Sequence, residues 1–227
     1  MMRHKVPWLV AAATLLLVMT AGWSVSNHGF SLQVLRTAAA QATASVEGFR
    51  SARFGMTEKK VYKALKKDFG IPKGDVTRTQ NSIEKTISLI ITKDDIIPDS
   101  GQAVIAYIFG YESNKLIQIN VIWSIDDTKP ASAENLVATG NILRNYFVAQ
   151  GFPQEGLLTN ARLNDGSIVM FRGIDPKGRA AILKLNIEKG VVSEGGTASD
   201  DKITSLKLTY ILDPVAPDIF KINAGEF

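Results

Sequence analysis

A single uncharged apolar run near the N-terminus determines where this chain folds. Residues Pro7 to Trp23 carry no charged side chain, and Arg3 and Lys5 precede them. A positive start followed by an apolar stretch directs a chain across a membrane, with the positive residues kept in the cytoplasm. We therefore expect residues 1–26 to be a signal peptide or a membrane anchor, and the rest of the chain to fold outside the cytoplasmic membrane.

Two outcomes for this leader stay open. The apolar run lies near the lower limit of roughly 17–25 residues for a spanning helix, which permits an uncleaved anchor with Ser24 to Val46 as its tether. A small-x-small cleavage site also exists at Ala40-Gln41-Ala42, far downstream of the run. The expected location is the periplasm, either as a soluble protein after cleavage or anchored in the inner membrane through Pro7–Trp23.

Beyond the leader, the chain contains neither cysteine nor histidine. The 227 residues include no cysteine, and the two histidines are His4 and His28. The exported part can form no disulfides and must be stabilised by an apolar core, which a domain of about 180 residues can supply. Zinc sites and redox-metal sites draw on His and Cys, so neither a metal nor another cofactor is expected. A disulfide-free exported chain without Asn-x-Ser/Thr sequons favours a bacterial cell envelope.

The net charge does not favour nucleic acid as a partner. The formal charge is +4, but residues 1–42 hold three of the 26 basic residues and none of the 22 acidic ones, which leaves 23 against 22. A nearly neutral domain has no strong field to attract a polyanion. Five clustered lysines are interpreted as one solvated helix face: Lys59, Lys60, Lys63, Lys66 and Lys67.

The clearest local signals are two amphipathic helices with similar ends. Thr57 is the expected N-cap of the first helix, and Ser132 is the expected N-cap of the second. The first should end at Gly70-Ile71-Pro72 and the second at Gly151-Phe152-Pro153, so a glycine–apolar–proline exit recurs 81 residues later. The apolar stripe of the first helix is expected to be buried: Val61, Ala64, Leu65 and Phe69.

Three strand candidates follow each helix, and they alternate in polarity or are densely apolar. After the first helix they are Ile83–Thr92, Ala103–Tyr111 and Leu116–Ile125, and after the second they are Ser167–Gly173, Arg179–Glu188 and Lys202–Leu212. We predict an α+β fold of two tandem helix–three-strand units, with an antiparallel sheet and the helices packed on one of its faces. The expected boundaries are a leader at 1–26, a linker at 27–48, a first unit at 49–127 and a second unit at 128–227, with structure starting near Phe49.

The start of the first helix carries a resemblance to a known group of proteins. The stretch Phe54-Gly55-Met56-Thr57-Glu58-Lys59-Lys60-Val61, with Gly70-Ile71-Pro72 after it, resembles the Gly-Met-Thr-x-x-x-Val opening of small bacterial envelope modules. These are the BamE/SmpA-like domains and the tandem-repeat fold of the beta-lactamase inhibitor protein. The resemblance implies a helix on a three- or four-stranded antiparallel sheet, in a non-catalytic module that binds proteins or stabilises an envelope assembly. The second helix lacks this opening, and the chain lacks the lipid-bearing cysteine of BamE-like lipoproteins.

Few residues indicate bond chemistry. Ser82-Ile83-Glu84-Lys85 matches the Ser-x-x-Lys pattern of serine acyl enzymes, but it leads into a predicted strand, where positions three apart face opposite sides. Trp123 and Tyr111 are interpreted as core aromatics rather than as parts of an exposed binding face. The loop acids lack the spacing of a calcium loop and are interpreted as solvated: Asp94, Asp95, Asp99, Asp126, Asp127, Asp200 and Asp201.

The expected function is that of an exported, non-catalytic binding or assembly module of the cell envelope that acts through protein–protein contact. We assign no catalytic, cofactor-binding or metal-binding residue. Two alternatives stay open: a periplasmic hydrolase that uses carboxylates or a Ser/Lys pair, and a carrier of a small apolar ligand. A broad, partly apolar face would favour a protein partner, whereas a compact pocket with converging polar groups would favour an enzyme or a carrier.

Overall fold

The computed structural model of this chain describes residues 44–125, 132–190, 200–222 and 225. These residues form an α+β fold in which two helices lie against one large antiparallel sheet. The expected leader, most of the expected linker, Asp126 and Asp127 lie outside the described residues. Within the described ranges, no helix is long and apolar enough to cross a membrane.

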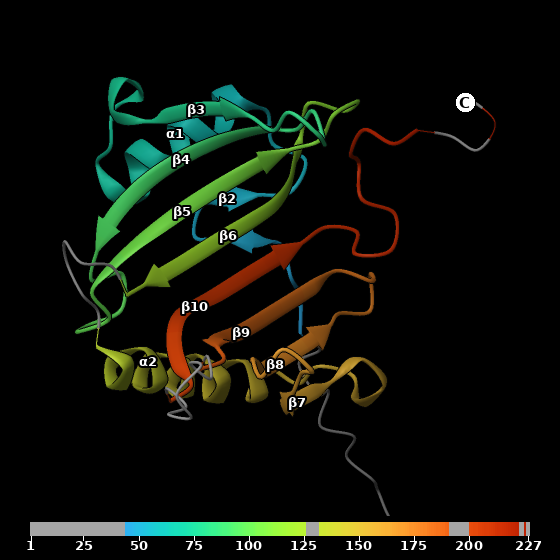
Figure 1. Cartoon of the computed structure of the whole chain (residues 1–227). Helices are drawn as coiled ribbons and strands as arrows, with labels where there is room; N and C mark the ends of the chain where they lie inside the picture. Colours follow the sequence, from blue (N-terminus) through green and yellow to red (C-terminus); the bar gives the residue numbers. More distant parts are fainter. Residues whose placement is uncertain (1–43, 126–131, 191–199, 223–224, 226–227) are drawn as a thin grey trace, which may run out of the picture. The chain divides into compact units, whose positions relative to one another are not determined.

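Eight strands form a continuous sheet in the order β3-β4-β5-β6-β10-β9-β8-β7 (Figure 1). The central pair is β6 with β10, where Val121 lies opposite Leu208. This pair joins the N-terminal four strands to the C-terminal four. The strands are β3 (Thr77–Gln80), β4 (Ile87–Asp94), β5 (Gln102–Phe109), β6 (Leu116–Ser124), β7 (Leu158–Arg162), β8 (Ile168–Ile174), β9 (Ala180–Glu188) and β10 (Lys202–Ile211).

The six predicted strands are present, and the structure adds the two edge strands β3 and β7. Each follows a single 3-10 turn, Lys73–Asp75 before β3 and Gln154–Gly156 before β7. All four residues of β3 are exposed, and so are four of the five residues of β7. Edge strands with little buried surface need no alternating apolar pattern, which is why the sequence pattern did not indicate them.

One predicted strand boundary was wrong. The strand expected to begin at Ile83 begins at Ile87, and residues 81–86 connect β3 to β4. Ile83 was expected on the same face as Leu89, but it is 79% exposed whereas Leu89 is buried. The side-chain oxygen of Asn81 accepts the backbone N–H groups of Ile83 and Glu84, at 2.9 Å each, and so holds this connection as a turn.

Both predicted helices are present, as α1 (Glu58–Phe69) and α2 (Ala133–Val148). Ser132 caps α2 as expected, because its hydroxyl accepts the Asn135 N–H at 3.1 Å. Thr57 stands at the N-cap of α1, but its hydroxyl makes no capping hydrogen bond, contrary to the prediction. Gly70 ends α1 with a φ of 72°, a left-handed conformation that favours glycine. The stripe of α1 is buried at Val61, Ala64 and Leu65, as predicted, whereas Phe69 is only half-buried. The five clustered lysines are exposed, as predicted.

A row of aromatic rings places both helices over the same face of the sheet. Phe69 of α1 lies 6.5 Å from Phe49, measured between ring centroids, and Phe49 lies 6.0 Å from Tyr210 of β10. Tyr210 in turn lies 6.1 Å from Phe147 of α2. Phe49 belongs to a small hairpin, β1 (Gly48–Phe49) with β2 (Ala52–Arg53), that lies between the helices. We call this the covered face of the sheet.

The core begins earlier in the chain than the expected start near Phe49. Ala44 and Val46 are 6% and 4% exposed and pack with the core residues. The backbone N–H of Val46 donates to Oδ2 of Asp175, at 2.9 Å, in the β8–β9 turn. The sequence pattern missed this segment because a few small apolar residues in extended conformation show no periodicity.

Candidate functional site

The Ser-x-x-Lys residues lie in the β3–β4 turn and not in a strand. Ser82 and Lys85 are both exposed, and Lys85 has a left-handed φ of 56°. The described part of the chain contains no hydrogen bond between these two side chains. The prediction that Ser82 and Lys85 lie in a strand and face its opposite sides was therefore wrong, because both residues lie in a turn.

The described loop acids are exposed, as predicted, and three of them accept hydrogen bonds. Oδ1 of Asp94 accepts from the Gln102 side chain at 2.8 Å, and Oδ1 of Asp95 accepts from the Gly101 N–H at 3.0 Å. Asp201 accepts from the Gly190 N–H at 3.3 Å, although the chain between them is not described. Among the residues with described positions, no group of three His, Cys, Asp or Glu residues is arranged to hold a metal ion.

The two aromatic residues singled out in the sequence have different surroundings. Trp123 is 1% exposed in the covered face, as predicted. Tyr111 is 42% exposed and packs edge-on against Phe220 at 5.5 Å, so its assignment to the core was wrong. The C-terminal segment brings Phe220 to this position, because Asp218 accepts the N–H groups of Glu112 and Ser113 at 2.9 and 3.0 Å.

The face of the sheet opposite the helices is a candidate binding surface. Successive strand residues point to opposite faces, so the strand register assigns every second residue to this side. We call it the open face, because no helix of the described chain packs on it. Most of its aliphatic side chains are half-buried or exposed, and Val104 is 39% exposed, although Val169 of β8 is buried and only 9% exposed. The half-buried or exposed ones include Ile90, Val104, Ala106, Ile108, Ile122 and Ile182.

Two lysines face each other near the middle of the open face. Lys207 of β10 lies directly opposite Lys184 of β9 in the register. Burial lowers the pKa of Lys207, and the positive charge of Lys184 lowers it further. Lys184 donates to Asp165 at 3.3 Å, whereas Lys207 has no ion-pair partner within the described ranges. Like charges directly opposite each other destabilise a sheet, so this pair does not serve stability.

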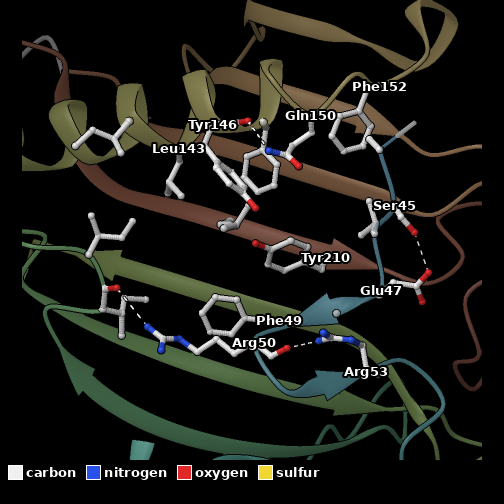
Figure 2. A pocket seen from close by; sticks show the side chains of 18 of the residues that line it. Ser45, Glu47, Phe49, Arg50, Arg53, Leu143, Tyr146, Gln150, Phe152 and Tyr210 are labelled. Atoms are coloured by element: carbon white, nitrogen blue, oxygen red, sulfur yellow. Dashed lines mark hydrogen bonds between the residues drawn. The ribbon is translucent and has the colours of Figure 1, made fainter. Parts of the chain in front are cut away.

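The covered face contains a hollow of about 590 Å³ between α2 and the β1–β2 hairpin (Figure 2). Its floor is formed by β6 and β10, through Trp123, Leu208 and Tyr210. Figure 2 shows Phe49 and Arg50 on the hairpin side, with Leu143 and Tyr146 of α2 opposite them. Ile96 and Ile97, from the loop between β4 and β5, also line it, as does Phe152 after α2.

The polar residues that line this hollow are Ser45, Glu47, Arg50, Arg53, Tyr146, Gln150 and Tyr210. Glu47 is bound to Arg179, whose Nη1 lies 2.8 Å from a Glu47 carboxylate oxygen. The hydrogen bond from Arg179 lowers the pKa of Glu47 to about 2, and Ser45 adds to this effect. Arg50 and Arg53 also line the hollow, and neither is in an ion pair among the residues described. Nε1 of Trp123, on the floor of the hollow, is buried without a hydrogen-bond partner among the described residues.

The sequence pattern did not indicate either surface. The open face and the hollow both depend on β6 pairing with β10, a contact between residues more than 80 positions apart. Periodicity within one segment indicates which residues share a face but not which strand lies beside it. Comparisons of this chain with protein families, with curated proteins and with solved structures found no match.

Proposed function

We propose that this chain is an exported, non-catalytic binding module of the bacterial cell envelope that contacts another protein through the open face of its sheet. The observation that carries the proposal is the composition of that face. Half-buried isoleucines lie beside a facing pair of lysines, and the described chain places no helix over them. Exposed surface that combines apolar groups with unfavourable like charges is typical of interaction sites rather than of surfaces selected for stability.

The charges of the open face favour an acidic partner surface. Lys184, Lys207 and Arg172 occupy its β8–β10 half, since Arg172 pairs with Ile182 in the register. Of these three basic residues, Asp165 contacts Lys184, and its other carboxylate oxygen accepts the backbone N–H of Ser167. Opposite charges across an interface speed association and select the partner. We therefore propose a protein that presents carboxylates around a small apolar area.

The export part of the proposal rests on the leader. Arg3 and Lys5 followed by Pro7–Trp23 have the order of a signal peptide or an anchor. The exported part contains no cysteine, which is compatible with folding in an oxidising compartment. A reporter fused after Phe227 should be active on the periplasmic side, and activity confined to the cytoplasm would contradict export.

We also propose that α1 with β3–β6 and α2 with β7–β10 are two tandem units. Each series runs from a helix through a Gly–apolar–Pro exit and a 3-10 turn to four strands. The edge strands β3 and β7 occupy equivalent ends of the sheet, and β6 and β10 meet at its centre. In this arrangement the open face belongs to both units, which enlarges the surface offered to a partner.

Site-specific photo-crosslinking in intact cells tests the binding proposal. A photo-reactive amino acid replaces Val104 on the open face in one variant and the exposed Lys63 of α1 in the control. We expect a discrete crosslinked species from position 104 and none, or a diffuse pattern, from position 63. Equal crosslinking from both positions, or none from position 104 and a discrete species from position 63, would contradict the assignment of the open face.

A further inference from the structure

We propose that the hollow between α2 and the β1–β2 hairpin binds a long-chain aliphatic carboxylate, a fatty acid, with its head group at Arg50. This site lies on the covered face, so the inference is independent of the proposed function of the open face. The site is bounded by α2, the β1–β2 hairpin and the floor of β6 and β10, and most of its lining is apolar.

The size and lining of the hollow suit a small apolar ligand. Its volume of about 590 Å³ lies within the range of about 300–1,000 Å³ that is typical of ligand pockets. The walls that face each other are aromatic or aliphatic, with Leu143 and Tyr146 on the α2 side and Phe49 on the hairpin side (Figure 2). Protein interiors are otherwise close-packed, so a hollow of this size beside the core requires an explanation.

Arg50 places a cation at the end of the hollow that Ile96 also lines. Arg50 donates through Nη2 to the carbonyl oxygen of Ile96, at 3.4 Å, in the loop between β4 and β5. The guanidinium of Arg50 is in no ion pair among the described residues, so its charge is available to a ligand. A cation of this kind binds a carboxylate through a charge-assisted hydrogen bond.

The Arg50 side chain is held in place by aromatic rings. Its guanidinium carbon lies 4.9 Å from the ring centre of Phe69 and 5.7 Å from that of Phe49. Such stacking orients the guanidinium without neutralising its charge. The nearby carboxylate of Asp68 accepts the Ser51 N–H at 2.8 Å. Arg50 also has a left-handed φ of 53°, an unfavourable conformation for arginine that is often found at functional positions.

The probe for this site is cis-parinaric acid, a fluorescent fatty acid that accepts excitation energy from tryptophan. The full-length chain contains Trp8, Trp23 and Trp123, so Trp8→Phe with Trp23→Phe leaves Trp123 as the single indole. We expect saturable binding of one molecule per chain, with quenching of Trp123 emission. Quenching of Trp123 also separates the hollow from unspecific binding to the apolar leader.

Head-group selectivity distinguishes this site from a general apolar surface. The acid should bind about tenfold more tightly than the alcohol of the same chain length, which corresponds to one charged hydrogen bond. Arg50→Gln should remove this preference and Arg50→Lys should retain most of it. Arg144→Gln is the matched control, because Arg144 is on α2 but does not line the hollow. Thermal unfolding of each variant establishes that the fold is retained.

Three results would overturn the inference. The first is a parinarate signal that does not saturate or that leaves Trp123 emission unchanged. The second is equal affinity for the acid and the alcohol. The third is an acid preference that survives in a folded Arg50→Gln variant.

Discussion

The two faces of the sheet are built from alternate residues of the same strands, yet they differ in almost every physical property. On β9, Leu183 is fully buried on the covered face, whereas its neighbours Ile182 and Lys184 are half-buried on the open face. The covered face is held together by rings and aliphatic side chains that pack under α1, α2 and the hairpin. The open face carries facing lysines that oppose stability. The difference places the close-packed core on one face, which supports our proposal that the other face serves binding.

The largest expected effect compares two adjacent residues of β9. Leu183→Ala should lower the free energy of unfolding by about 2–5 kcal/mol, because it leaves a cavity in the close-packed face. Ile182→Ala should cost clearly less, since its side chain is already partly solvated. Chemical denaturation measures both values. Equal losses would mean that the open face is covered in the folded protein, and the comparison between the faces would fail.

The next effect concerns the buried ion pair between Asp175 and Arg179, in the turn between β8 and β9. Arg179 lies 2.7 Å from Asp175 through Nη2 and is 6% exposed. Burial opposes ionisation of Asp175, but the N–H groups of Val46, Lys177 and Arg179 and the Arg179 side chain together lower its pKa. Arg179→Met should destabilise the protein by about 1–3 kcal/mol, since Asp175 keeps its backbone donors but loses its counter-ion.

The same substitution should free the segment around Val46, which hydrogen exchange at its N–H would detect. Lys177→Met is the control, because Lys177 is exposed and its contact with Glu47 is 3.5 Å long. Surface ion pairs of this kind contribute little. A loss from Lys177→Met as large as that from Arg179→Met would show that the buried cluster has no special role.

A smaller effect should appear as pH dependence. The Arg179 hydrogen bond lowers the pKa of Glu47 from 4.5 to about 2. A carboxylate with a lowered folded-state pKa stabilises the fold above its ordinary pKa, and this contribution is lost as the pH falls from about 4.5 towards 2. The wild type should therefore exceed Glu47→Gln in stability at pH 6, and the difference should shrink steadily below pH 4.5. A difference that is constant with pH would contradict the ion pair.

The smallest expected effect is at the facing lysines. Lys207→Gln removes a like-charge contact with Lys184, so stability should stay unchanged or rise by up to about 1 kcal/mol. Thermal or chemical unfolding at low salt is the suitable measurement, because salt screens this repulsion. A clear loss of stability would mean that Lys207 makes a favourable contact and that the open face does contribute to the fold.

The contrast between the faces also explains what the sequence predicted. The burial of Leu89, Leu65 and Trp123 follows from periodicity, because each lies in a segment with its own apolar pattern. The early core segment depends on the distant contact between Val46 and Asp175, so its local pattern did not indicate it. The edge strands bury too little surface to show a pattern, and the turn at Ile83 is held by the side chain of Asn81. The hollow required the hairpin of Phe49 and the ring of Phe147 to meet above β10, which only the tertiary arrangement determines.

The most direct test of the central claim is crosslinking from position 104 after charge reversal on the open face. The double substitution Lys184→Glu and Lys207→Glu should abolish the crosslinked species without lowering the stability of the domain. The matched control reverses two exposed lysines of α1, Lys63→Glu and Lys67→Glu, and should leave crosslinking unchanged. Undiminished crosslinking in a folded protein with both open-face lysines reversed would contradict an acidic partner at this face.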